Sequence, residues 1–255
     1  MVDEAQAITG WRMGAVVGSF PNCELVRGNR CDYSDPAEQA ITIERSTVIV
    51  SEEHVLVVPA SLIDAIGVID GFTREVDRFL KPILASDQLS YRPRSEMETD
   101  PSFKQLIPYV LMQWTDDQTG DVQLFAYTRG GGSGESRLHA QRSIGVGGHI
   151  SEEDADGDAD PYTTGMKREL DEEVVIDSSY VDSREGLLYD DSNEVGRVHL
   201  GVIHRYILDQ PAVRSNEPDI AAGEFVSVKR LHQEIDQLET WSQLCLKALY
   251  PSAVN

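Results

Sequence analysis

The run Arg168-Glu169-Leu170-Asp171-Glu172-Glu173 is the stretch of this sequence that decides its fold. A good helix start, Asp160-Pro161, lies just before it: Asp can accept hydrogen bonds from free helix amides, and Pro suits the first helical position. Met166, Leu170 and Val174 follow four residues apart, so they would bury one stripe of a helix. The sequence therefore predicts an amphipathic helix that begins near Pro161.

Three carboxylates share a second face of this helix. At about 100° per residue, Glu169, Glu172 and Glu173 fall together. Gly165 lies one turn earlier on the same face and presents no side chain to obstruct it. The like charges repel by a few tenths of a kcal/mol. One interpretation is a solvated acidic face, and the other is a site for a hard cation such as Mg²⁺ or Mn²⁺. Helix geometry alone does not choose between them.

The order of residues around the helix resembles a known family. The Nudix box has the core Arg-Glu-aliphatic-x-Glu-Glu-x-Gly-aliphatic, preceded by a Gly and a Glu. This sequence is similar to it in three successive parts: Gly147-Gly148-His149-Ile150, an acidic segment and residues 168–176. Residues 223–228 look like the strand that closes this fold before its final helix. The resemblance implies an α/β (α+β) fold class, an α/β/α sandwich of mixed sheet and flanking helices. Residues 103–255 would form this domain, and residues 1–102 an N-terminal α+β extension.

Two features depart from the family pattern. Val175 stands where the family has Gly, so the helix must end without the usual left-handed Gly turn. The spacing between the glycine pair and Arg168 is also longer, by about six residues, and the extra length falls in residues 151–160. This insertion follows the early spacing of a calcium-binding loop, although a solvated acidic insertion explains it better. The upstream acidic position is left open among Glu152, Glu153 and Asp154.

The resemblance implies a metal-dependent pyrophosphohydrolase that cleaves a diphosphate linkage in a nucleoside diphosphate derivative or a similar small molecule. The cofactor would be Mg²⁺ or Mn²⁺, which neutralises phosphate and activates a water molecule. Arg168 would orient a carboxylate. Glu169 or Glu172 is our first choice as general base, and Glu217 or Asp219 is the alternative. The expected metal ligands are Glu169, Glu172, Glu173 and the backbone carbonyl of Gly147.

Basic and polar side chains near two loops are candidates for substrate binding. Those around the glycine-rich stretch could hold phosphate, although a surface charge is the more common interpretation of each alone: Arg129, Arg137, His139 and Arg142. Residues 188–201 predict a hairpin connection capped by Asp and Asn. The alternative interpretation puts side chains of that connection at the mouth of the site: Asp190, Asp191, Arg197 and His199.

The charge composition limits the classes of molecule that the protein is expected to bind. The chain has 44 acidic and 22 basic residues, a formal net charge of −22. So acidic a protein repels nucleic acid and anionic membranes, and the expected partner is a small-molecule diphosphate. No apolar run approaches the roughly 20 residues that span a bilayer. The three cysteines lack metal-ligand spacing, and the N-terminus does not resemble a secretory signal. We expect a cytoplasmic protein, with a homodimer possible.

Two alternatives to hydrolysis remain. Some relatives of this fold isomerise a small prenyl diphosphate, a reaction that requires a reactive Cys near the metal. Cys23, Cys31 and Cys245 all lie far from residues 168–173 in sequence, which disfavours it. The second alternative is a catalytically inactive Nudix-fold ligand-binding or regulatory module. The intact glutamates and Arg168 argue against this, while Val175 leaves room for it.

Periodicity and turn residues predict the remaining elements. A polar connector is expected over residues 85–101, and Pro82 leaves open an earlier end of the helix expected over Thr73–Leu84. The expected strands are Ser46–Val50, Val55–Pro59, Ser136–Val146, Val198–Leu208 and Glu224–Val228, with a hairpin of Ile107–Trp114 and Val122–Arg129; the expected helices, besides the acidic one, are Ser61–Val68, Thr73–Leu84 and Leu231–Leu249.

Overall fold

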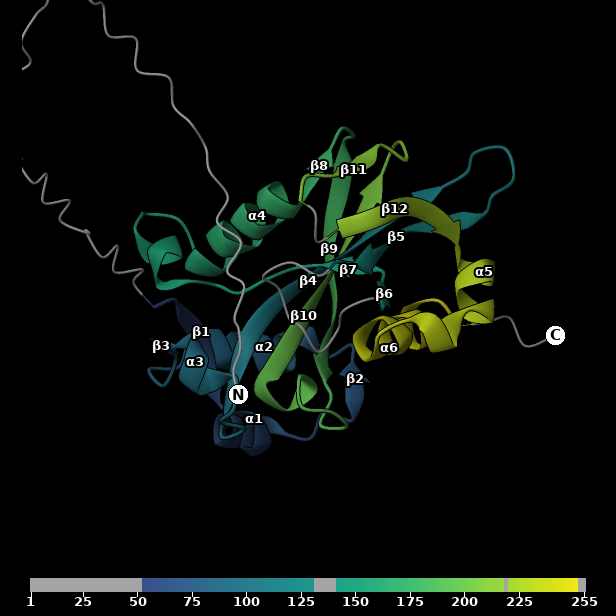
Figure 1. Ribbon diagram of the computed structural model, residues 1–255. Helices are drawn as coiled ribbons and strands as arrows, with labels where there is room; N and C mark the ends of the chain where they lie inside the picture. Colours follow the sequence, from purple (N-terminus) through teal and green to yellow (C-terminus); the bar gives the residue numbers. More distant parts are fainter. Residues whose placement is uncertain (1–51, 131–140, 218–219, 252–255) are drawn as a thin grey trace, which may run out of the picture. The chain divides into compact units, whose positions relative to one another are not determined.

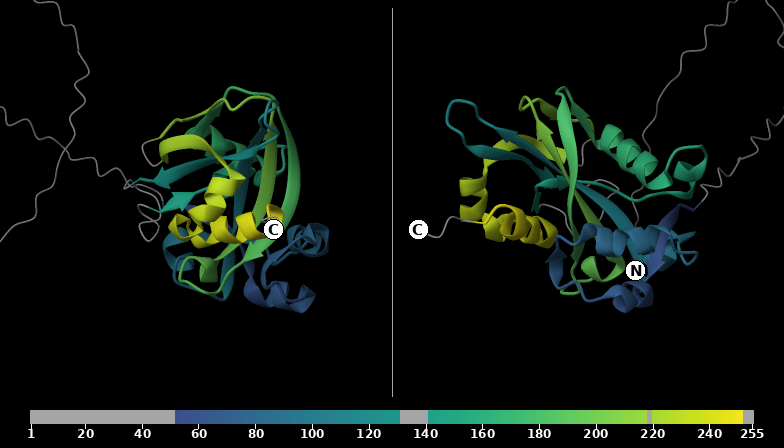
Figure 2. Two further views of the ribbon diagram at one scale, coloured as in Figure 1. Left: turned by 90° about the vertical axis from the view of Figure 1, so that its right-hand side faces the viewer. Right: turned by 180° about the vertical axis from the view of Figure 1, so that it is seen from behind.

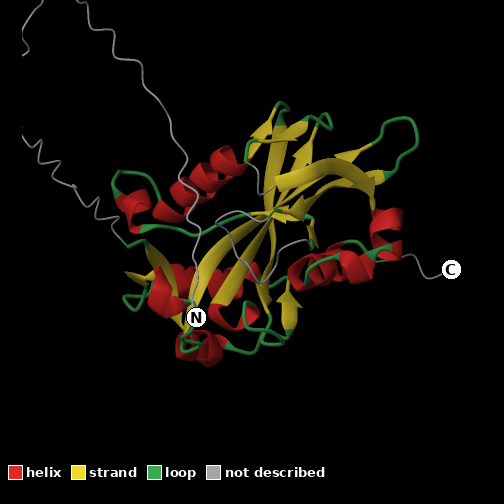
Figure 3. Cartoon of the chain, viewed as in Figure 1, coloured by secondary structure: helices red, strands yellow, loops and turns green. Residues whose placement is uncertain are grey.

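A mixed β-sheet with helices on both faces forms the part of the chain that the structure describes (Figure 1). This computed structural model describes residues 52–130, 141–217 and 220–251, all within one compact unit. The expected strand Ser46–Val50 lies outside these ranges. The expected α/β sandwich of mixed sheet and flanking helices is confirmed (Figure 3).

The elements follow one another along the chain with short connections. The strands are β1 His54–Pro59, β2 Gly71–Thr73, β3 Ser90–Pro93, β4 Phe103–Thr115, β5 Val122–Arg129, β6 Arg142–Ser143, β7 Gly145–Val146, β8 Val174–Ile176, β9 Tyr180–Tyr189, β10 His199–Leu208, β11 Val213–Ser215 and β12 Ile220–Ser227. The helices are α1 Ala60–Ile66, α2 Val76–Leu84, α3 Arg94–Met97, α4 Pro161–Glu173, α5 Val228–Gln233 and α6 Thr240–Leu249, with 3₁₀ turns η2 Glu152–Ala155, η3 Gly196–Val198 and η4 Ile235–Gln237.

Strand β4 organises the main sheet. The sheet order is β12-β5-β4-β10-β9-β2, and β4 runs parallel to β10 but antiparallel to β5, β1 and β7. The β4–β5 pair is the hairpin expected from the polar turn, which contains Gly120 at φ 73°. Because side chains alternate along a strand, β4 contributes to the cores on both faces of the sheet.

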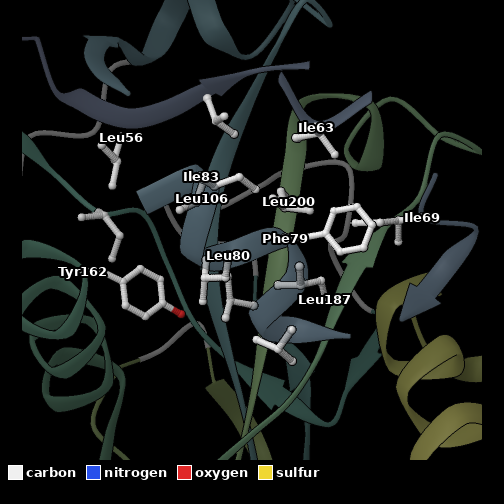
Figure 4. Close-up of a cluster of buried hydrophobic side chains, with 14 residues drawn as sticks. Leu56, Ile63, Ile69, Phe79, Leu80, Ile83, Leu106, Tyr162, Leu187 and Leu200 are labelled. Atoms are coloured by element: carbon white, nitrogen blue, oxygen red, sulfur yellow. The ribbon is translucent and has the colours of Figure 1, made fainter. Parts of the chain in front are cut away.

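Helices α2 and α4 cover one face of the sheet, and α6 covers the other (Figure 2). On the first face, Leu106 packs with Phe79 and Ile83 of α2 (Figure 4), and Val110 belongs to the cluster that α4 joins. On the second face, Tyr109 packs with the residues of α6. Burial of apolar surface on both faces is the main stabilising contribution to this arrangement.

Residues before Phe103 share this sheet. Strand β1 pairs antiparallel with β4, and β2 pairs with β9 at the opposite edge. The expected boundary between residues 102 and 103 therefore falls inside one compact unit. The polar stretch expected to be a plain connector, residues 85–101, contains β3 and α3. It adopts them because β3 pairs with β1, and α3 packs beside them with Met97 buried.

Helix α2 ends at Leu84 as expected, because the buried Phe79, Leu80 and Ile83 outweigh the hydrogen bond that Pro82 lacks. One helix prediction was wrong. The long helix expected over residues 231–249 is divided into α5, η4 and α6. None of the helices in the described ranges is long and apolar enough to cross a membrane.

Candidate active site

Helix α4 begins as its sequence predicts. The Asp160 side chain accepts a hydrogen bond from the Thr163 amide at 3.1 Å, and Pro161 occupies the first turn. Met166 and Leu170 are buried against the sheet, as is Val174 just past the helix end. The buried stripe fixes the rotation of α4, and the carboxylates of the acidic face lie beside it.

The C-terminal end of α4 is built without glycine. Val174 adopts an extended conformation (φ −139°), and the chain enters β8, which pairs with β11. Asn216, directly after β11, takes over the capping: its side-chain amide donates to the carbonyls of Asp171 and Glu172, both at 3.1 Å. Its backbone amide donates to the carbonyl of Glu173 at 2.8 Å. Val175 therefore lies in a strand that a left-handed Gly turn would break.

Arg168 connects the helix to the acidic insertion. Its guanidinium donates to both carboxylate oxygens of Asp154, at 2.8 and 2.9 Å, and to the carbonyl of His149 at 3.0 Å. The Asp154 side chain is 3% exposed and also accepts from the Ser151 amide. Hydrogen bonding to Asp154 raises the pKa of Arg168 above its usual value. Of the three acidic residues left open by the sequence, the structure places Asp154 beside the arginine.

Glu169 lies between Arg168 and the glycine pair. One carboxylate oxygen accepts from Arg168 at 2.8 Å, and the other lies 2.0 Å from the position that a Cβ on Gly148 would take. Burial raises the pKa of Glu169, and Arg168 offsets part of that effect. The absence of a side chain at Gly148 thus lets this carboxylate reach the loop backbone.

Gly165 has a different role from the one expected. A Cβ at this position would lie 2.5 Å from a carboxylate oxygen of Asp154 and 2.8 Å from Ile150. Gly165 is buried, and the space beside it is filled by the insertion, so it does not leave the carboxylate face open. Its small size instead allows η2 to pack directly on α4.

A pocket opens on the other side of the glycine pair. Gly147 and Gly148 form part of its wall, so the pocket and Glu169 meet at Gly148. Its lining combines aromatic rings with polar groups from several distant segments: Arg94, Ile107, Tyr109, Arg129, Gly147, Gly148, His149, Asn193, Val195, His199, Glu239, Thr240 and Trp241. Apolar walls with a few convergent polar groups are typical of small-molecule sites.

Two imidazoles lie at the centre of this wall. The rings of His149 and His199 are 5.6 Å apart, and the ring of Trp241 is 6.3 Å from that of His199. His199 contacts the carbonyl of Val195 through Nδ1 at 2.7 Å. The Nε2 atom of His149 is buried without a hydrogen-bond partner, as is the Nε1 atom of Trp241. Burial, aided by nearby Arg94, holds the pKa of His149 well below its ordinary value, so this ring is neutral at pH 7.

Comparisons with known proteins bear on the family and the fold. No protein-family model matches the chain. Protein YmaB of Bacillus subtilis (strain 168) is 37% identical over 181 residues, which cover 68% of this chain and 85% of the relative. The crystal structure of Tm1382, a putative Nudix hydrolase, superimposes with a TM-score of 0.63 at 28% identity, covering 77% of this chain and 98% of that one.

The chain belongs to the Nudix family. The segment that resembles the Nudix box is residues 147–176, and its insertion at residues 151–160 folds back onto helix α4 through Asp154 and Arg168. The structural similarity to Tm1382 covers 77% of the chain, which is more than residues 103–255 make up.

The three box glutamates differ in their surroundings. The side chain of Glu169 is 16% exposed and that of Glu172 is 52% exposed, and both accept from the same nitrogen of Arg168, at 2.8 and 3.4 Å. Glu173 is half-buried at the end of the helix. Their oxygens do not form one tight group. Among the described residues, the group of potential ligand atoms that lie within 4.8 Å of one another is Glu98, His149 and His199.

The structure separates the expected substrate-binding residues. Arg129 lines the pocket. Arg142 instead pairs with Glu234 at 2.7 Å and Glu224 at 3.3 Å, which joins β6 to the C-terminal segment. Arg137 and His139 lie outside the described residues, as does the alternative base Asp219. Glu217 is exposed in the loop that caps the end of α4.

The connection between β9 and β10 combines both of its expected roles. Asp190 accepts from the Ser192 amide, and Asn193 accepts from that of Gly196, as in a capped turn. Asp191 pairs with the buried Lys104, and Arg197 donates to the Asp191 carbonyl. Of the four candidates from this segment, His199 lines the pocket.

Sequence reasoning missed several residues of the pocket. Arg94 comes from the polar stretch expected to be a connector, and Trp241 lies within the helix expected over residues 231–249. Glu239 was not singled out, although it is 4% exposed and accepts a hydrogen bond from Tyr109 at 2.6 Å. No local pattern marks these residues, because segments far apart along the chain bring them together only when the protein folds.

Proposed function

We propose that this protein is a Nudix pyrophosphohydrolase that uses Mg²⁺ or Mn²⁺ to cleave a diphosphate linkage in a nucleoside diphosphate derivative or a similar small molecule. The observation that carries the proposal is the meeting of Glu169 and the pocket at Gly148. A substrate in the pocket would have its diphosphate beside the box carboxylates. Family membership supports hydrolysis of pyrophosphate linkages in general.

The donor set of the box fits a hard divalent cation. Glu169 and Glu172 both accept from one nitrogen of Arg168, so their carboxylates point toward a common position. Carboxylate and carbonyl oxygens are the ligands that Mg²⁺ and Mn²⁺ prefer. Glu169, Glu172, Glu173 and the Gly147 carbonyl would hold the ion. Once bound, the ion would neutralise phosphate oxygens and lower the pKa of a water molecule.

The remaining roles belong to the side chains of this chain. Arg168, held by Asp154 on one side, fixes the orientation of Glu169 on the other. Either Glu169 or Glu172 accepts the proton of the attacking water. Arg129, in the pocket wall, offers a guanidinium to the phosphates. The aromatic wall around Trp241 excludes water and binds the group attached to the diphosphate.

A matched pair of variants tests this proposal. Purified protein with Mg²⁺ or Mn²⁺ is assayed against a panel of diphosphate compounds, beside Glu172→Gln and Asp171→Asn. Both substitutions remove one negative charge from α4, but Asp171 lies on a different face, next to Val174 and Tyr206. We expect Glu172→Gln to lower kcat by about 10²-fold or more, and Asp171→Asn to leave it within about twofold. Undiminished activity in Glu172→Gln would contradict the proposed site, and metal binding without turnover would favour the regulatory module.

A further inference from the structure

Two residues of the pocket wall, His149 and His199, belong to a second set of potential metal ligands, separate from the box glutamates. Glu98, His149 and His199 each present one ligand atom, and these atoms lie within 4.8 Å of one another. They come from three separate places in the fold: the end of α3, the loop after β7 and the start of β10. We propose that these three residues bind a transition-metal dication such as Zn²⁺ beside the Nudix box.

The state of His149 is the first observation that points to a ligand. Its Nε2 atom is buried and has no hydrogen-bond partner, which is costly for a polar atom away from water. Its ring lies 5.6 Å from the ring of His199. A metal ion placed between the two imidazoles would satisfy this nitrogen.

The orientation of His199 is the second observation. Its Nδ1 atom lies 2.7 Å from the carbonyl oxygen of Val195. A carbonyl oxygen only accepts, so Nδ1 must carry the proton, and in the neutral ring the lone pair is then on Nε2. Metal-binding histidines are commonly held in this way, with the second ring nitrogen donating to a carbonyl or carboxylate. The Val195 contact thus selects the tautomer that can ligate.

The donor chemistry distinguishes this set from the box. Two imidazoles and one carboxylate suit Zn²⁺ and neighbouring transition metals, whereas Mg²⁺ prefers oxygen ligands alone. Zinc lies about 2.0–2.2 Å from such ligands, so binding would draw the three atoms together by about 1 Å. Glu98, with a side chain 25% exposed, has room to make most of this movement. Three protein ligands would leave a coordination position for water or for substrate.

Two arginines near the set do not prevent binding, because each is already paired. Arg94 donates to Glu53 at 2.8 Å as well as to Glu98 at 3.4 Å. Arg168 is paired with Asp154 and Glu169. Their charges are therefore largely offset by carboxylates other than Glu98, and the net charge of −22 favours the approach of any cation.

Zinc binding is tested directly, without substrate. The protein carrying Glu172→Gln and Glu173→Gln, which weakens the box site, is dialysed against Zn²⁺ with excess Mg²⁺, and bound zinc is counted by mass spectrometry. We expect one tightly bound zinc per chain. His149→Gln and His199→Gln should each lower zinc affinity by at least about tenfold. The control His232→Gln should not, because His232 contacts the Tyr250 carbonyl in the C-terminal segment.

The absorption spectrum of bound Co²⁺ identifies the ligands. Nitrogen and oxygen ligation gives visible bands without the thiolate charge-transfer band that cysteine ligands would add. His149→Gln removes an unpartnered nitrogen, so it should fold normally, and circular dichroism verifies this for each variant. Zinc affinity unchanged in both His149→Gln and His199→Gln, or a thiolate band, would overturn the proposal. Because no turnover is measured, the result is independent of the proposed hydrolysis.

Discussion

Substitution of Gly148 by Ala tests the contact on which the candidate site depends. The added Cβ would lie 2.0 Å from one carboxylate oxygen of Glu169 and 2.3 Å from the carboxylate carbon. Ordinary van der Waals contact begins near 3.4 Å, so the carboxylate must move by about 1.4 Å. Gly148 is not in the left-handed region, so Ala is compatible with its backbone. The substitution therefore acts on Glu169 and not on the loop itself.

The expected losses of stability and activity follow from that displacement of the carboxylate. Overpacking of this kind costs about 1–3 kcal/mol, and the low end applies because the far end of a side chain can rotate away. A displacement of about 1 Å in a catalytic group can cost about 10²-fold in rate. We expect Gly148→Ala to lower kcat/KM by about 10²-fold on whichever diphosphate is turned over, with a fall in stability of about 1 kcal/mol.

Thermal denaturation and steady-state kinetics measure the two effects together. Gly157→Ala is the control, because a Cβ there would have no neighbour closer than 4.0 Å. A double-mutant cycle with Glu169→Ala isolates the contact: once the carboxylate is removed, Gly148→Ala should become nearly neutral, a coupling of about 1 kcal/mol. Additive stability changes in the cycle, or activity of Gly148→Ala within twofold of the parent, would refute the reasoning.

Three further predictions concern the supports of the site. Asp154→Asn should lower the free energy of unfolding, measured by chemical denaturation, by about 2 kcal/mol, because it leaves Arg168 without its bidentate carboxylate partner. This figure is reduced from that of a fully buried pair because the Arg168 side chain is 32% exposed. No loss of stability would mean that this pair is dispensable. Val175→Gly, which restores the family residue, should lower the free energy of unfolding by about 0.5–1 kcal/mol and should not raise activity. The reason is that Val175 pairs with Arg214 in a strand, where Gly is unfavourable. A gain in stability or in activity would show that the helix end prefers a Gly turn. Burial lowers the pKa of His149 below 6.5 in the folded state, so on acidification the unfolded state binds the proton before the folded state does. Stability therefore falls as the pH drops below about 6.5. Melting temperatures measured between about pH 5 and 8 should fall less steeply on acidification in His149→Gln than in the parent.

Where local interactions decide the structure, the sequence alone was sufficient. The start of α4 depends on Asp160, Pro161 and Thr163, which are neighbours along the chain. The β4–β5 hairpin depends on one polar turn containing Gly120. The three box glutamates and Arg168 were recognisable for the same reason, because their spacing is fixed by one helix.

Longer-range contacts overrode local patterns elsewhere. The apolar periodicity of residues 231–249 favoured one helix. In the structure, the buried Glu239 side chain accepts a hydrogen bond from Tyr109, and the Glu239 backbone amide donates to the carbonyl of Arg142 at 2.9 Å. Its side chain then accepts from the amides of Trp241 and Ser242 and starts α6 afresh. The energy of these buried contacts exceeds the propensity of a few residues to continue a helix.

The acidic helix α4 shows where this division lies. The sequence by itself determined that helix, its buried stripe and the order of its charged residues, because each depends on positions within about four residues of one another. Only the tertiary structure chose Asp154 as the partner of Arg168, replaced the missing Gly with Asn216, and brought Glu98, His149 and His199 together. Those contacts join residues far apart along the chain, and the packing of the whole sheet sets their distances.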